Sequence, residues 1–115
     1  MKQRIDLHKL LSQATEKDQQ IASFALLSLG VIESLVGGAA TASRAVELFF
    51  HADNCLFVRN ELRQKVADEI MSRGVQLPDI FDALPAEEAQ QEFQRELATM
   101  RSLCLKFLEG KQLAA

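Results

Sequence analysis

The clearest pattern of apolar and polar positions lies near the C-terminal end of the chain. Between about residues 86 and 109, apolar side chains recur at alternating steps of four and three residues. These residues are Phe93, Leu97, Met100, Cys104 and Phe107. This heptad-like spacing places all of them on one face of an α-helix. The pattern predicts an amphipathic C-terminal helix that packs its apolar face against the rest of the protein.

A second helix is predicted from residue 16 to residue 36, and it is apolar on two sides. One stripe consists of Ile21, Phe24, Ala25, Ser28, Val31, Ile32 and Leu35. The other consists of Ala22, Leu26 and Leu29. A helix with two apolar sides is expected to be buried on both. The stretch from residue 19 to residue 43 is also long and apolar enough to suit a membrane span, but Glu33 near its middle favours a buried helix. Gly37 and Gly38 predict its end.

No glycine or proline interrupts residues 41–73. These residues can therefore form one helix of about 30 residues, with Thr41 or Ser43 as its N-terminal cap. Alternatively, the helix breaks near residues 52–54, because Asp and Asn side chains compete with the helix backbone for hydrogen bonds.

Gly74 is expected to end that helix, and Pro78 and Pro85 each suit the first turn of a further one. With a short helix over residues 2–12, these segments predict a single all-α domain that covers residues 1–115. We expect a bundle of four to five helices with one long central helix and the amphipathic C-terminal helix. The length of 115 residues, with 48% hydrophobic and 25% charged residues, is typical of one soluble globular domain.

The predicted helix over residues 41–73 has apolar side chains on two opposite sides. Its main apolar face includes Leu48, whereas Phe50 and Phe57 lie on the other side. Leaving two phenylalanines exposed would forgo about 2 kcal/mol of burial each. We therefore expect a homodimer, with Phe49, Phe50, Asn54 and Phe57 at its interface.

Two charged residues are expected to pair inside the bundle. Arg59 falls in the centre of the main apolar face, and Glu33 is the only charge between residues 19 and 43. A buried guanidinium without a partner is costly, so we expect an ion pair between Glu33 and Arg59. Two other interpretations stay open. A helix break near Asp53 would turn Arg59 out to solvent, or Arg59 would bind a ligand.

The charges of the chain indicate which partners it suits. The net charge is −3 and the basic residues are scattered, which argues against nucleic acid as a partner. Acidic residues concentrate in the segment 79–96, where Arg95 is the single base. They are Asp79, Asp82, Glu87, Glu88, Glu92 and Glu96. This segment is either a solvated helix face or a docking site for a basic protein partner.

Arg44, Glu47 and His51 fall on one side of the predicted helix and are the main candidates for catalytic chemistry. Glu47 and His51 are four residues apart, so Glu47 could orient His51 as a general base. The alternative is a polar helix face with a surface histidine. His51 and Cys55 are half of a possible zinc site, but the other histidine and cysteine are distant in the sequence. We therefore expect no metal and no cofactor.

The segment RAVELFFH, from Arg44 to His51, resembles the Arg-x4–6-His motif of the HEPN ribonucleases. The resemblance implies a small all-α domain that dimerises across the motif, with Arg44 and His51 as the RNA-cleaving pair. Ala45 departs from the family pattern, which usually has a polar residue directly after the arginine.

These features predict a small interaction or regulatory protein that homodimerises and binds another macromolecule. Two cysteines without CxxC spacing and an N-terminus without an apolar leader favour a cytoplasmic location. Two other functions stay open. One is a HEPN-like ribonuclease, or an inactive relative, that uses Arg44 and His51. The other is a helical bundle that binds a small apolar ligand among its Phe and Met side chains.

Overall fold

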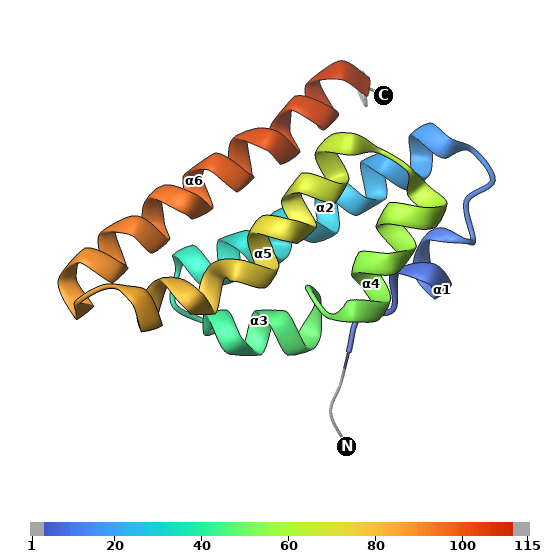
Figure 1. Ribbon diagram of the computed structural model, residues 1–115. Helices are drawn as coiled ribbons and strands as arrows, with labels where there is room; N and C mark the ends of the chain where they lie inside the picture. The colour runs from blue at the N-terminus through green and yellow to red at the C-terminus, as the bar shows by residue number, and fades with distance from the viewer. Residues whose placement is uncertain (1–3, 112–115) are drawn as a thin grey trace.

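The computed structural model describes residues 4–111, and every regular element in this range is helical (Figure 1). The elements are α1 (Leu7–Leu11), α2 (Lys17–Val36), α3 (Ala42–Leu48), α4 (Ala52–Phe57), a π-helical turn η1 (Val58–Leu62), α5 (Lys65–Ala83) and α6 (Ala86–Lys111). The prediction of an all-α bundle is confirmed, with six α-helices in the described range where four to five were expected.

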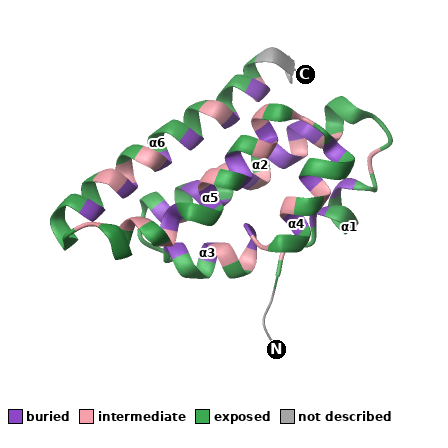
Figure 2. Cartoon of the chain, viewed as in Figure 1, coloured by how far each residue is buried: buried purple, intermediate pink, exposed green. Residues whose placement is uncertain are grey.

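The three long helices, α2, α5 and α6, form the body of the bundle. The most extensive contacts join α6 to α2 and to α5, and α6 runs in the opposite direction to both (Figure 1). The short helices α1, α3 and α4 pack beside this body. The buried residues lie on the helix sides that face one another (Figure 2).

The amphipathic C-terminal helix is confirmed. Its five predicted apolar positions are all buried in the single core: Phe93, Leu97, Met100, Cys104 and Phe107. This one-sided burial is what the heptad-like spacing requires of a helix that covers the bundle from outside.

Helix α2 is buried on its main stripe but not on both sides. Phe24, Ala25 and Ile32 are fully buried, whereas the side chain of Leu26 is 55% exposed. In the described part of the chain, α2 is the one helix that is long and apolar enough to cross a membrane. Core helices of soluble proteins share this property, and α2 packs along α6 inside a compact globule. Gly37 closes the helix, and Gly38 follows it with a positive φ of 78°, as the sequence predicted.

The single helix predicted over residues 41–73 is wrong, and the alternative of a break is confirmed. Thr41 caps α3 by accepting a hydrogen bond from the backbone N–H of Arg44, but the helix ends at Leu48. Phe49 and Phe50 are both buried. Both rings therefore enter the core from the irregular backbone of the break and not from a helix face.

The break also corrects the predicted interface. Phe49, Phe50 and Asn54 are buried inside the chain, and the half-buried ring of Phe57 packs edge-on against the ring of His8, 5.7 Å away. These residues need no second chain to cover them. The homodimer stays a prediction. It was inferred from a single helix with two apolar faces, and residues 41–73 do not form that helix.

Helix α5 continues through Gly74 and Pro78, where the sequence predicted an end and a new start. Ile70, Gly74 and Leu77 lie on one buried face of this helix. The backbone of Gly74 lies directly against the ring of Phe50, and a β-carbon at position 74 would overlap that ring. Glycine is therefore required at this position for packing.

The contact of Phe50 with Gly74 predicts opposite effects of alanine at two helical glycines. Gly30 in α2 has open space where a β-carbon would lie. Gly30→Ala should therefore stabilise the fold by about 0.5–1 kcal/mol through helix propensity. Gly74→Ala should destabilise it by about 1–3 kcal/mol, because overpacking outweighs the same propensity gain.

Urea unfolding of the two variants measures both free energies. The additional substitution Phe50→Leu should recover part of the loss in Gly74→Ala, because it removes ring atoms from the contact. A Gly74→Ala protein as stable as the wild type would show that Phe50 does not press on α5.

Candidate functional site

The polar residues around the helix break hold the N-terminal segment. Asn54 is buried, and its side-chain Oδ1 accepts a hydrogen bond from the backbone N–H of Leu7 at 3.0 Å. Its Nδ2 donates to the backbone carbonyl oxygens of Ile5, at 2.9 Å, and Phe49, at 2.8 Å. The backbone N–H of Ile5 donates to the carbonyl of Leu48 at 2.8 Å. Asn54 thus satisfies three backbone groups that the irregular chain leaves without helical partners.

Both ring nitrogens of His51 are occupied in the same network. Nε2 lies 3.0 Å from the carbonyl oxygen of Ile5, and Nδ1 lies 2.6 Å from Nη2 of Arg4. Nδ1 also caps α4 by accepting from the backbone N–H of Asn54. Nδ1 thus faces two donors and Nε2 faces an acceptor, which suits the tautomer that carries its proton on Nε2. His51 is therefore engaged in holding the fold.

The three residues proposed for catalysis lie on both sides of the point where α3 ends. Arg44 and Glu47 pair within α3, with 3.5 Å between Nη1 and Oε2. His51 lies beyond the end of that helix, so the shared helical face that would have carried all three residues does not exist. Glu47 and His51 do line one groove of about 650 Å³, but Arg44 is outside its lining.

That groove lies between α3, α4 and α5 and contains Cys55, yet it holds no activated nucleophile. Burial raises the pKa of the Cys55 thiol, and Sγ lies 3.7 Å from the carbonyl oxygen of Phe50 in donor geometry. A protonated thiol is a poor nucleophile and a poor metal ligand. Within residues 4–111, no three His, Cys, Asp or Glu side chains are grouped so as to hold a metal ion, so His51 and Cys55 gain no further ligands.

The predicted ion pair between Glu33 and Arg59 is wrong. Glu33 pairs with Arg101 of α6, with 2.9 Å between Oε1 and Nε, and Arg59 pairs with Asp68 at 3.5 Å. The break at Phe49 and the π-helical turn rotate Arg59 away from the core, and its side chain is 62% exposed. Both pairs lie at the surface, where each contributes little to stability.

The acidic segment 79–96 divides into two parts in the structure. In the first part, Arg73 joins α5 to α6 by hydrogen bonds to Glu69, at 2.9 Å, and to Glu96, at 2.6 Å. The hydrogen bond to Glu96, and then that to Glu69, raises the pKa of the Arg73 guanidinium. Glu92 pairs with Arg95 on the same helix. These carboxylates have partners and line a groove of about 670 Å³ between α5 and α6.

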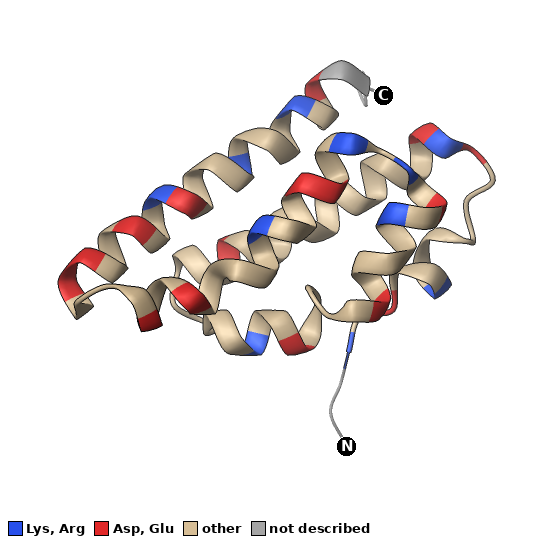
Figure 3. Cartoon of the chain, in the orientation of Figure 1, with Lys and Arg blue, Asp and Glu red and all other residues tan. Residues whose placement is uncertain are grey.

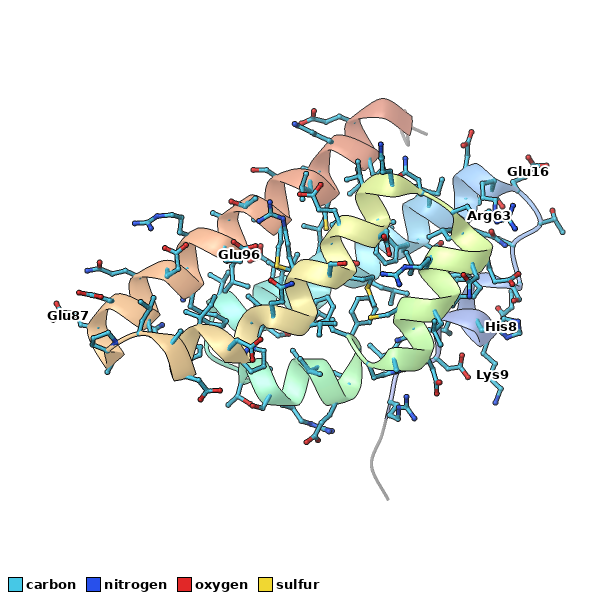
Figure 4. All side chains as sticks on the ribbon, in the orientation of Figure 1. His8, Lys9, Glu16, Arg63, Glu87 and Glu96 are labelled. Atoms are coloured by element: carbon cyan, nitrogen blue, oxygen red, sulfur yellow. The ribbon has the colours of Figure 1, made fainter. Side chains whose placement is uncertain are left out.

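The second part consists of Asp79, Asp82, Glu87 and Glu88, which we call the acidic corner. All four are exposed at the turn that joins α5 to α6 (Figure 3). No ion pair or side-chain hydrogen bond engages their carboxylates among the residues that the structure describes. Figure 4 shows Glu87 pointing outward at this end, whereas Glu96 lies between α5 and α6. The corner is the main concentration of unpaired charge in the described chain.

Substitution of Asn54 tests its role in holding the N-terminal segment. Asn54→Ala would leave the buried N–H of Leu7 and the carbonyl of Phe49 without partners, so we expect a loss of about 2–4 kcal/mol in unfolding free energy. Asn60→Ala, at an exposed position of η1, should change it by less than about 0.5 kcal/mol. Hydrogen exchange at the Leu7 amide should accelerate selectively in Asn54→Ala, and unchanged protection there would contradict the assignment.

The buried thiol of Cys104 predicts how stability depends on pH. Burial raises its pKa from 9.0 to about 12. The unfolded chain therefore loses this proton first, and the stability that is present below pH 9 falls as the pH rises toward 12.

Between about pH 9 and pH 10.5, the wild type should lose about 1.5 kcal/mol more unfolding free energy than Cys104→Ala, which lacks this group. Urea titrations of both proteins at the two pH values measure the difference. Parallel loss in the two proteins would show that Cys104 ionises equally well in the folded chain.

No protein-family model matches the chain, and the curated proteins and the solved structures contain no significant match to it. The resemblance of the segment from Arg44 to His51 to the HEPN motif therefore gains no support from these comparisons. The function has to be inferred from the surface of the molecule itself.

Proposed function

We propose that the protein is a small helical binding module that docks a basic segment of a partner protein on the acidic corner. The observation that carries the proposal is the presence of four exposed carboxylates without partners in the described chain at one end of the bundle. Opposite charge on a partner would be attracted to such a site and oriented by it.

The helix dipoles distinguish the carboxylates that stabilise a helix end from those that do not. Glu87 and Glu88 lie in the first turn of α6, where the helix dipole favours negative charge. Asp82 lies in the last turn of α5, where the dipole disfavours it, and that turn contains no basic residue. Asp79 lies just before that turn. The two aspartates therefore oppose local stability, which is typical of residues kept for binding.

The alternative functions have weaker support. The ribonuclease would need Arg44 and His51 at one site, but the helix break separates them and both nitrogens of His51 are engaged. A small apolar ligand has a place in the groove near Phe50 and Met71, which is wide and open to solvent on one side. Neither alternative accounts for the aspartates at the end of α5.

A titration with an oligolysine peptide tests the proposal. We expect binding at about 20 mM salt that weakens strongly by about 200 mM, because exposed charges are screened at the higher ionic strength. The variant Asp79→Asn/Asp82→Asn should lose most of this binding. The same variant should be more stable than the wild type by about 0.3–1 kcal/mol, because it removes charge from a helix C-terminus.

A matched control changes the net charge equally at the opposite end of the molecule. Glu16 lies far from Glu87 (Figure 4), and Glu61 lies near Glu16, because Lys17 donates to its backbone carbonyl. Glu16→Gln/Glu61→Gln should bind oligolysine as the wild type does. Equal losses in the two double variants would mean that only net charge matters, and the acidic corner would not be a site.

A further inference from the structure

A cavity of about 490 Å³ opens beside the acidic corner, where the end of α2 and the start of α3 meet α5 and α6. Its apolar lining includes Leu35, Ala40, Ala42, Pro78, Phe81 and Phe93. The same lining contains four polar side chains: Thr41, Ser43, Asp82 and Gln90. The size lies in the lower part of the range for ligand pockets, about 300–1,000 Å³.

Phe81 is the main apolar group that this cavity leaves uncovered. Its side chain is 42% exposed, although its ring packs edge-on against the buried ring of Phe93 with 5.0 Å between centroids. Phe81 continues the α5 face that Gly74 and Leu77 bury. The ring therefore packs on Phe93 on one side and is exposed on the other, as is typical of aromatic anchors at protein interfaces.

The walls on the α3 side are small. Gly38, Ala40 and Ser43 contribute little side-chain volume, so the space in front of Phe81 stays empty. Gly38 adopts a positive φ, which explains the glycine at that position, but the conformations of Ala40 and Ser43 do not demand small residues. An occupant with one bulky apolar side chain would fill this space.

The charge at the rim selects among apolar occupants. Asp82 follows Phe81 directly in the chain, and its carboxylate has no partner among the described residues. An anionic lipid or a nucleic acid would be repelled by the acidic corner. A protein segment with Lys or Arg beside an apolar side chain meets both requirements.

We infer that this cavity receives a large apolar side chain of the partner segment, flanked by basic residues that contact Asp82 and the acidic corner. The inference rests on the proposed function and adds to it the apolar half of the recognised motif. Phe81 is the residue that the partner side chain covers.

Three short peptides distinguish the two proposals: Lys-Lys-Leu-Lys-Lys, Lys-Lys-Gly-Lys-Lys and Glu-Glu-Leu-Glu-Glu. In an NMR titration, the Leu-containing lysine peptide should bind the wild type about tenfold more tightly than the Gly-containing one. The glutamate peptide should bind at least about tenfold more weakly than either lysine peptide.

Two variants locate the apolar contact. Phe81→Ala removes the ring, and Ser43→Phe fills the cavity from an exposed position of α3 without changing any charge. Both should abolish the preference for Leu over Gly and leave the binding of the Gly peptide unchanged. Leu56→Ala, at an exposed apolar residue of α4, is the control and should keep the preference.

The other possible results of these titrations would overturn the cavity inference, the proposed function or both. Equal binding of the Leu and Gly peptides to the wild type would overturn the cavity inference and leave the proposed function standing. If neither of the two lysine peptides binds, both the proposed function and the cavity inference are overturned. Tight binding of the glutamate peptide, or a concentration-dependent dimer that Ser43→Phe dissociates, would assign the cavity to a different occupant and overturn the inference.

Discussion

The arrangement of the middle of the chain depends on the burial of Phe49 and Phe50 at the break between α3 and α4. Helix α3 ends at Leu48 and α4 begins at Ala52, so both rings lie in the irregular step between the two helices. Phe49 then stacks on Phe24 of α2, with 6.3 Å between ring centroids, while Phe50 packs on the backbone of Gly74 in α5. One irregular step in the chain therefore joins two of the three long helices.

A helix break of this kind leaves backbone groups that need partners, and this need explains the polar residues beside it. Asn54 and His51 satisfy the carbonyls of Phe49 and Ile5 and tie down the N-terminal segment. The sequence predicts a dimer interface for Asn54 and offers His51 as a candidate for catalysis. Their geometry assigns them to the fold, and the surface charge that remains unexplained is at the far end, around Asp79 and Asp82.

The sequence patterns predicted the structure correctly where a feature depends on residues that are close together in the chain. The apolar seam of α6, the Thr41 cap and the glycines after α2 depend on neighbours within one or two helical turns, and the structure confirms them. The Asp and Asn side chains at residues 53 and 54 indicate a break as one of two alternatives, but the contacts of Asn54 with Ile5 and Leu7 that stabilise the broken chain lie far away in the sequence. The prediction that Arg59 lies in the core assumes one continuous helix over residues 41–73. The break changes the direction in which the later side chains point, so this prediction fails. The cavity at Phe81 was missed for a similar reason, since its walls come from four helices.

The hydrogen bond from Leu7 to Asn54 spans 47 residues, and this span sets an order of events during synthesis. A ribosome adds about 5–20 residues per second, so roughly 2–10 s separate the appearance of Leu7 from that of its partner. The N-terminal segment is made first, yet it cannot take its final position until the chain beyond the break has emerged. During that interval α1 lacks its contacts with α4, which hold it in the folded chain.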